Sequence, residues 1–217
     1  MNTLYTWLTA ACLITMLTAC HSPGQGEPSK AESPESDSPE ADSAQAENAP
    51  GFRDAGQLMI VDFRKGMDLD AWEVEDDVVM GGRSSGHIKM NTEGHALFFG
   101  EVSLENNGGF SSVQHYFEPI DISAYDTACI RLKGDGKNYR FLVEGDPQKR
   151  HYYVYPFQTT GQWQTIEVPL RQMYPEFRGD RLNRPNYPGE TLSMVRIMIS
   201  NKQAESFRIE IDAIWLK

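Results

Sequence analysis

The chain has 217 residues, of which 40% are hydrophobic, and it carries a net charge of −11. This is the composition of a globular protein with an excess of acid. It argues against nucleic acid as a partner, because phosphates require a basic surface. The three cysteines, at positions 12, 20 and 129, lie far apart in the sequence, and their spacing does not support a zinc site.

The N-terminal segment predicts a secreted protein with a lipid anchor. Residues 4–19 contain no charged residue and are shorter than the roughly 20 residues of a membrane span. They fit the hydrophobic region of a secretory signal. The run ends in Leu17-Thr18-Ala19-Cys20, which resembles a bacterial lipoprotein signal. The resemblance implies that residues 1–19 are removed and that Cys20 carries diacylglycerol and an acyl chain such as palmitate. The alternative is an uncleaved membrane anchor.

Residues 20–50 read as the lipidated cysteine and a disordered linker. The stretch is rich in Ser, Pro, Glu and Ala and lacks large apolar residues, so it cannot bury enough surface to offset its ordering entropy. His21, rather than Asp, follows Cys20, which by resemblance to enterobacterial lipoproteins predicts the outer membrane, with the protein facing the periplasm. Seven acids and one lysine give residues 21–50 a charge of −6, which leaves −5 for residues 51–217.

From Gly51 onward the hydrophobic period is two. Phe207, Ile209 and Ile211, for example, alternate with polar residues, as expected of a strand with one buried face. Glycine, asparagine and proline mark turns between the runs. We read 174–189 as a long irregular loop and find no long amphipathic helix. The predicted strands are 58–63, 72–75, 87–91, 96–102, 109–117, 128–133, 139–144, 151–157, 163–168, 193–200 and 207–212.

This pattern predicts one all-β domain over residues 51–217, with two packed sheets or a jelly roll. The mature domain would contain Cys129 as its single cysteine. We therefore expect no intrachain disulfide and a packed, unreactive thiol at this position.

Two glycine-rich stretches stand out, at 76–86 (DDVVMGGRSSG) and 108–112 (GGFSS). Their glycines tolerate a positive φ, and if Gly82 has one, Gly82→Val should destabilise the fold far more than Ser85→Val. Asp76 and Asp77 are adjacent and would point to opposite faces of a strand, which does not suit a carboxylate pair acting on one glycosidic bond. The sequence also lacks a nucleophile elbow, a phosphate loop and a zinc-protease motif. We therefore predict that the protein is not an enzyme.

Several motifs in order along the domain resemble the complex I intermediate-associated protein 30 family. They are 77–86, Phe99-Gly100, 105–113, Gly134-Asp135-Gly136, Trp163-Gln164-Thr165, Phe177-Arg178-Gly179 and 199–203. The resemblance implies a jelly-roll β-sandwich of the galactose-binding-domain type. Eukaryotic members assist the assembly of mitochondrial complex I (NADH:ubiquinone oxidoreductase). This chain departs from the family in its lipoprotein signal and in Gln114, where we expect an arginine.

Polar and aromatic residues near these motifs suit a binding surface. Asn, Ser, Arg and Asp side chains can bond sugar hydroxyls, and aromatic rings can stack on sugar rings. The alternative is structural: the glycines form turns or bulges, the asparagines cap carbonyls and Trp163 packs in the core. The candidate ligand- or partner-binding residues are Arg83, Ser84, Asn106, Asn107, Phe110, Asp135, Tyr139, Trp163, Arg178 and Lys202.

Calcium ligands are conceivable from Asp76, Asp77, Glu105 and Asp135, but their spacing is not that of a known calcium loop. We predict no metal site and no cofactor. The function expected first is that of a membrane-anchored binding module that docks a protein partner and assists assembly of a membrane or envelope complex. The alternative is a carbohydrate-binding module for cell-envelope or environmental glycan. A docking face should be a contiguous apolar patch, and a sugar site a cleft with exposed aromatic rings.

Overall fold

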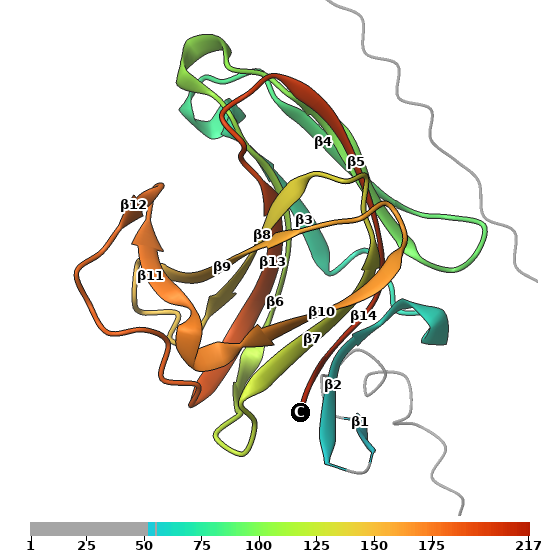
Figure 1. Ribbon diagram of the computed structural model, residues 1–217, viewed down its shortest axis with the longest axis vertical. Helices are drawn as coiled ribbons and strands as arrows, with labels where there is room; N and C mark the ends of the chain where they lie inside the picture. Colours follow the sequence, from blue (N-terminus) through green and yellow to red (C-terminus); the bar gives the residue numbers. More distant parts are fainter. Residues whose placement is uncertain (1–51, 55) are drawn as a thin grey trace, which may run out of the picture. The chain divides into compact units, whose positions relative to one another are not determined.

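The computed structural model describes residues 52–54 and 56–217 (Figure 1). The predicted signal, the predicted lipidation site at Cys20 and the predicted linker lie outside these residues. No helix within the described part of the chain is long and apolar enough to cross a membrane.

The described residues form an all-β domain, as the sequence predicts. The strands are β1 (Phe52–Asp54), β2 (Gln57–Asp62), β3 (Trp72–Asp76), β4 (Ser85–Met90), β5 (Ala96–Val102), β6 (Ser111–Asp121), β7 (Thr127–Lys133), β8 (Asn138–Glu144), β9 (Tyr152–Gln158), β10 (Trp163–Pro169), β11 (Tyr174–Phe177), β12 (Asp180–Arg181), β13 (Thr191–Ile199) and β14 (Glu205–Leu216). Four short 3₁₀ helices connect them: η1 (Phe63–Lys65), η2 (Asp77–Met80), η3 (Glu105–Asn107) and η4 (Leu170–Gln172).

The strands form two antiparallel sheets (Figure 1). In the first, which we call the β14 sheet, the N-terminal half of β14 pairs with β5, and its C-terminal half pairs with β2. Strand β7 pairs with the opposite edge of β14 and carries β10 beside it. The second, the β13 sheet, has the order β12-β11-β9-β8-β13-β6-β3. Together they form the predicted jelly-roll sandwich.

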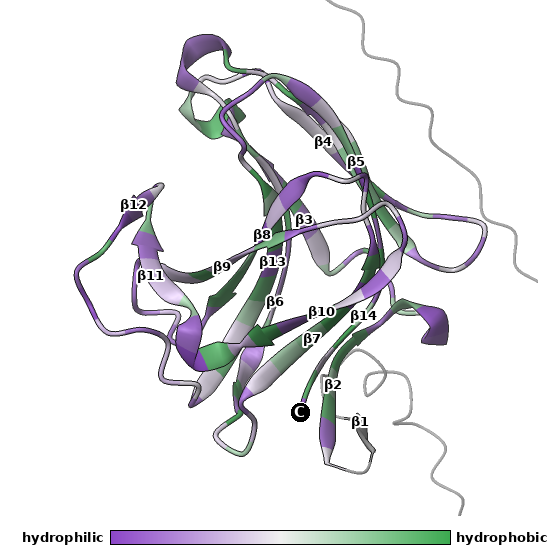
Figure 2. Ribbon diagram, in the orientation of Figure 1, coloured by the Kyte–Doolittle hydropathy of each residue, from purple (hydrophilic) through white to green (hydrophobic). Residues whose placement is uncertain are grey.

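The core lies between the sheets, and alternation along the strands decides which side chains enter it. In β13, Val195, Ile197 and Ile199 are buried in the core cluster, so Arg196 and Met198 point to the opposite face. The same alternation of hydrophobic and hydrophilic residues is visible along the strands in Figure 2. Cys129 on β7 is also buried, and this burial raises the pKa of its thiol, as expected of a packed and unreactive cysteine.

The prediction of an irregular loop over residues 174–189 is wrong in its first half. Tyr174 and Glu176 of β11 pair with β9, and β12 closes a tight hairpin on β11. The alternation was too short to reveal these strands, because β12 has only two residues and β11 contains Pro175. Proline cannot donate to a ladder and is normally confined to edges and strand ends.

Candidate ligand-binding cleft

The two glycine-rich stretches lie against each other because one carboxylate binds both. Asp77 is fully buried at the start of η2. Its oxygens accept hydrogen bonds from the Ser84 amide (2.9 Å) and hydroxyl (2.5 Å), and from the amides of Gly109 (2.6 Å) and Phe110 (3.2 Å). We call this set of contacts the Asp77 clamp. It fixes the loop after β3 to the loop before β6.

Glycines at these positions make room for the clamp. A Cβ atom on Gly82 or Gly108 would overlap the Asp77 carboxylate. The condition of a positive φ at Gly82 is not met: its neighbour Gly81 adopts that conformation, with φ of 93°. The neighbouring Asp76 makes a second pair of bonds, from the Gly86 amide (2.9 Å) and the Ser111 hydroxyl (2.5 Å). Both aspartates therefore accept hydrogen bonds from backbone amides and serine hydroxyls, and in this way hold the loops in place.

The electrostatics of Asp77 follow from these donors. Burial by itself raises the pKa of this carboxyl group, but the hydrogen bonds from Ser84, Gly109 and Phe110 outweigh burial and hold the pKa below its usual value. Asp77 is therefore an ionised structural group, and its acceptor sites are already in use.

A cleft of about 900 Å³ lies on the face of the β13 sheet that points away from the core. Outward-facing residues of adjacent strands form its floor. They fall into rows, because Arg196 of β13 is in register with Leu142 of β8, and Met198 of β13 is in register with Arg140 of β8. Tyr152 of β9 and Glu176 of β11 are likewise paired and extend the floor toward β12.

Two arginines of the floor are held by fixed partners. Arg196 is 3% exposed, donates to Glu75 at 2.7 Å, and lies over the ring of Tyr152 at 4.8 Å. Its Nε is buried without a hydrogen-bond partner among the described residues. Arg140 forms an ion pair with Glu176 and contacts the hydroxyl of Tyr174 at 3.5 Å. The floor thus presents oriented guanidinium groups beside an aromatic ring.

The rims of the cleft come from loops and turns. One rim contains Val79, Met80 and Leu104, which are 73%, 58% and 45% exposed, together with the segment from Asn107 to Phe110. The opposite rim contains Phe177, Arg178 and Gly179, where β11 turns into β12. This turn has two central residues, Arg178 and Gly179, with φ of 51° and 87°, as a type I′ hairpin requires.

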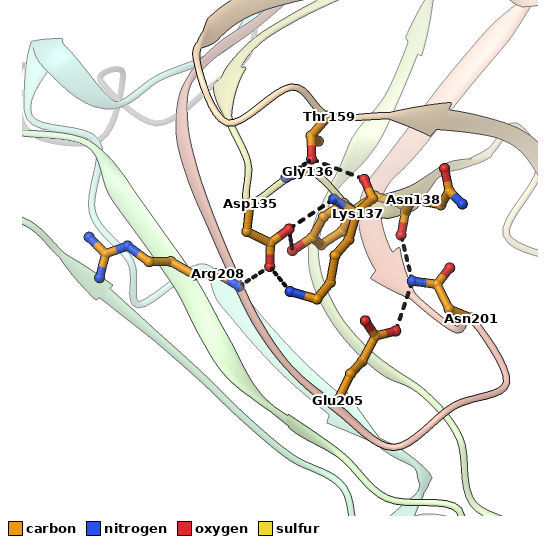
Figure 3. A network of polar contacts seen from close by, with 9 residues as sticks. Asp135, Gly136, Lys137, Asn138, Thr159, Asn201, Glu205 and Arg208 are labelled. Carbon is orange, nitrogen blue, oxygen red and sulfur yellow. Dashed lines mark hydrogen bonds and ion pairs between the residues drawn. The ribbon is translucent and has the colours of Figure 1, made fainter.

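Lys202 lies at one end of the cleft in the connection between β13 and β14, and the neighbouring Asn201 fixes this connection. The Asn201 side chain donates to the Asn138 carbonyl (3.1 Å) and to Glu205 (2.9 Å), as Figure 3 shows. In the same network, Asp135 accepts from the Tyr139 hydroxyl at 3.1 Å and from the Arg208 amide at 3.0 Å. The position of Lys202 is therefore set by contacts outside the cleft.

The structure brings four of the ten predicted binding residues together in the cleft: Asn107, Phe110, Arg178 and Lys202. Two others lie near it. Arg83 is exposed and pairs with Glu105 at 3.1 Å, and the Asn106 side chain caps the Gly81 carbonyl at 3.1 Å.

The remaining four are elsewhere. Ser84 and Tyr139 are buried and bonded within the domain, so the prediction that they present side chains to a ligand is corrected. Asp135 borders a separate hollow of about 620 Å³ that also contains His87 and Arg208. Trp163, on the β14 sheet, contacts His95 at 4.6 Å between ring centroids.

Sequence reasoning missed the floor of the cleft. Glu75, Arg140, Tyr152, Glu176 and Arg196 all line it, yet none belongs to a glycine-rich motif. The available signal was strand alternation: Arg140 and Arg196 fall at the polar positions of β8 and β13. Alternation does not predict the order of the strands, and it is this order that places β8 beside β13 and β9 beside β8.

The four acids considered as calcium ligands do not form a cluster. Asp76 and Asp77 bind backbone and serine donors, and Asp135 lies in the network of Figure 3. Within residues 56–217, one group of metal-type ligands is close enough to share an ion: Glu93, His95 and Glu210. Glu210 already accepts from Asn91 at 3.0 Å and Arg208 at 3.1 Å.

The fold is a jelly-roll β-sandwich that resembles those of solved carbohydrate-binding modules. The structure is similar to a family 11 carbohydrate-binding module from Clostridium thermocellum, solved in complex with a β-1,3-1,4-mixed-linked tetrasaccharide, with a TM-score of 0.54 and 17% identity. That match covers 74% of this chain and 94% of the module. A second structure, of the family 11 module of a cellulosomal cellulase from the same organism, matches with a TM-score of 0.54, 18% identity and coverage of 76% and 95%.

The chain belongs to the complex I intermediate-associated protein 30 (CIA30) family, whose model matches residues 61–211. It is 28% identical over 180 residues to the mouse (Mus musculus) mitochondrial complex I intermediate-associated protein 30. The alignment covers 72% of this chain and 55% of the mouse protein, so the chain spans about half the length of this curated relative. The family resemblance read from the motifs is confirmed.

Proposed function

We propose that this protein is a non-catalytic binding module and that its cleft binds an oligosaccharide. The observation that carries this proposal is the composition of the cleft. Tyr152, Phe110 and Phe177 supply aromatic surfaces, while Asn107 and the arginines supply hydrogen-bond donors on the same face. Sugar rings need this combination, because they have apolar faces and a rim of hydroxyl groups. The volume of about 900 Å³ is within the range of ligand sites.

The rigidity of the cleft supports the same function. The Asp77 clamp holds one rim, and two ion pairs, Arg140–Glu176 and Arg196–Glu75, hold the arginines of the floor. A site whose side chains are already ordered loses less conformational entropy when a ligand binds. The likeness to a module solved with a tetrasaccharide is a likeness of fold, and it motivates the choice of oligosaccharides as the first ligands to test.

The test is isothermal titration of the purified chain with oligosaccharides of cell-envelope and plant origin. We expect binding, and we expect Phe177→Ala to weaken it about tenfold, which corresponds to about 1.4 kcal/mol. The matched control is Phe99→Ala, because Phe99 is a partly buried phenylalanine on the β14 sheet. The proposal fails if no oligosaccharide binds, or if both substitutions have the same effect on affinity.

Protein docking is the second candidate, and one observation favours it. Val78, Val79, Met80 and Leu104 are exposed and gather around η2 and η3, where they form a small apolar surface. Crosslinking in intact cells followed by mass spectrometry tests this function. Reproducible capture of one protein complex, lost in Val79→Asp, supports docking and an assembly role. If Val79→Asp captures the same protein complex to the same extent as the parent, this apolar surface is not the docking site.

A further inference from the structure

The cleft is basic although the domain is acidic. Its lining contains five cations, Arg140, Arg150, Arg178, Arg196 and Lys202, and two carboxylates, Glu75 and Glu176. Residues 51–217 together carry −5. Cations on an acidic protein are normally spread among the acids, so an excess of three positive charges in one cleft is a local feature that points to the charge of its ligand.

The excess charge lies at the mouth of the cleft. Arg140 and Arg196, on the floor, are paired with Glu176 and Glu75. Arg150, Arg178 and Lys202 are exposed and form no ion pair with any carboxylate of the described residues. These three are therefore available to an anion that enters from solvent.

The backbone at two of these positions does not favour a cation. Arg178 and Lys202 have φ of 51° and 58°, in the left-handed region where glycine and asparagine are preferred. Within the described residues, four residues other than glycine adopt a positive φ, and three of them, Asn107, Arg178 and Lys202, line the cleft. Conformations of this kind are strained and are concentrated at binding sites.

We propose that the ligand of the cleft is an acidic oligosaccharide whose units carry carboxylate groups, as uronic acids do. The inference rests on the oligosaccharide-binding function proposed above and specifies its ligand class. The sugar lies against Tyr152 and Phe177, whose rings also contact the guanidinium groups of Arg196 and Arg178, at 4.8 and 5.4 Å from the ring centroids. Its carboxylates lie toward Arg150, Arg178 and Lys202, where a guanidinium can bind a carboxylate through two parallel hydrogen bonds.

The first experiment compares matched ligands on the purified full-length chain. The probes are tetrasaccharides of galacturonate, glucuronate and mannuronate, each beside the same tetrasaccharide with its carboxyl groups reduced to alcohols. We expect at least one uronate to bind tenfold or more tightly than its reduced form, with an affinity that falls between 20 and 500 mM salt as screening increases.

Three outcomes would overturn the inference, and they separate it from the proposed function. If the reduced forms bind as tightly as the uronates, the cleft binds neutral sugar, and only the acidic ligand class is wrong. If inorganic polyphosphate competes as well as the uronates, the cleft recognises charge and not sugar. If no oligosaccharide binds, the proposed function fails together with the inference.

The second experiment removes the cations without disturbing the backbone. Asparagine tolerates left-handed φ, so Arg178→Asn and Lys202→Asn keep their turns; Arg150→Gln removes the third charge. The control for Arg150→Gln is Lys149→Gln, which also removes one positive charge, next to Arg150 but outside the lining of the cleft. We expect the triple variant to bind uronate at least tenfold more weakly, with a melting temperature near that of the parent. Unchanged affinity, or an equal loss in the control, overturns the inference.

Discussion

Gly82 belongs to the glycine-rich stretch 76–86 because the buried carboxylate of Asp77 leaves no room for a side chain at this position. Its Cα lies so close to the Asp77 carboxylate that an added Cβ would overlap it, while its own φ is ordinary. We therefore expect Gly82→Val to lower the free energy of unfolding by more than about 1 kcal/mol relative to Ser85→Val, because overpacking displaces the clamp. Urea unfolding of both variants measures the difference. Equal, small losses would show that the carboxylate can move aside.

Asp77 also makes stability depend on pH. Folding lowers the pKa of this carboxyl group, so its contribution is complete above the unfolded pKa of about 3.9 and is lost as pH falls through the native pKa. Asp77→Asn removes this dependence and leaves the amides of Gly109 and Phe110 without a carboxylate, which costs about 2 kcal/mol at pH 7.

The measurement is the urea midpoint of the parent, Asp77→Asn and Glu118→Gln between pH 2 and pH 7. Glu118 is exposed, so its variant should follow the parent. The difference in stability between the parent and Asp77→Asn should be large at pH 7 and shrink toward pH 2. A constant difference across this range would show that the charge of Asp77 does not contribute.

At the scale of strands, alternation was sufficient to predict the fold. The expected strand 96–102 coincides with β5, and most others agree to within a few residues, because their inward positions are apolar. The order of the strands and the position of the cleft could not be predicted from the sequence. They depend on pairings between distant segments, such as Gln114 of β6 with Arg196 of β13 and Tyr152 of β9 with Glu176 of β11. The family motifs led to Asn107, Phe110, Arg178 and Lys202, and three of these residues, Asn107, Arg178 and Lys202, have a positive φ in loops at the rim of the cleft.

The central strand β13 and the edge strand β12 of the β13 sheet should differ in local stability. Strand β13 is paired along most of its length with β6 on one edge and β8 on the other. Strand β12 has two residues and pairs only with β11 among the described strands. We expect amides of β13 to exchange with solvent only on global unfolding, and those of Asp180 and Arg181 to exchange within the shortest times sampled. Hydrogen exchange by NMR or mass spectrometry measures both. Comparable protection of β12 and β13 against exchange would contradict the prediction that β12 opens locally.

At the scale of the whole molecule, charge is segregated. Residues 21–50 and the domain are both acidic, whereas the cleft has an excess of cations. Anionic surfaces repel an acidic protein at long range, so positive charge confined to a cleft favours anionic ligands that enter the cleft over non-specific attachment of the surface. This distribution of charge is consistent with the acidic oligosaccharide proposed above.

We propose that Cys20 anchors the chain to the outer membrane, since the end of the hydrophobic run at 17–20 resembles a lipoprotein signal. Several acyl chains hold a protein stably where one does not. The segment predicted from the sequence as a linker has about 30 residues and, as a flexible coil, would span on the order of 30 Å. Cys20→Ala should therefore move the protein from the membrane pellet to the soluble periplasmic fraction, while Cys129→Ala should leave it in the pellet. Sucrose-gradient fractionation of the parent should place it with outer-membrane markers. Retention of Cys20→Ala in membranes would favour an uncleaved anchor.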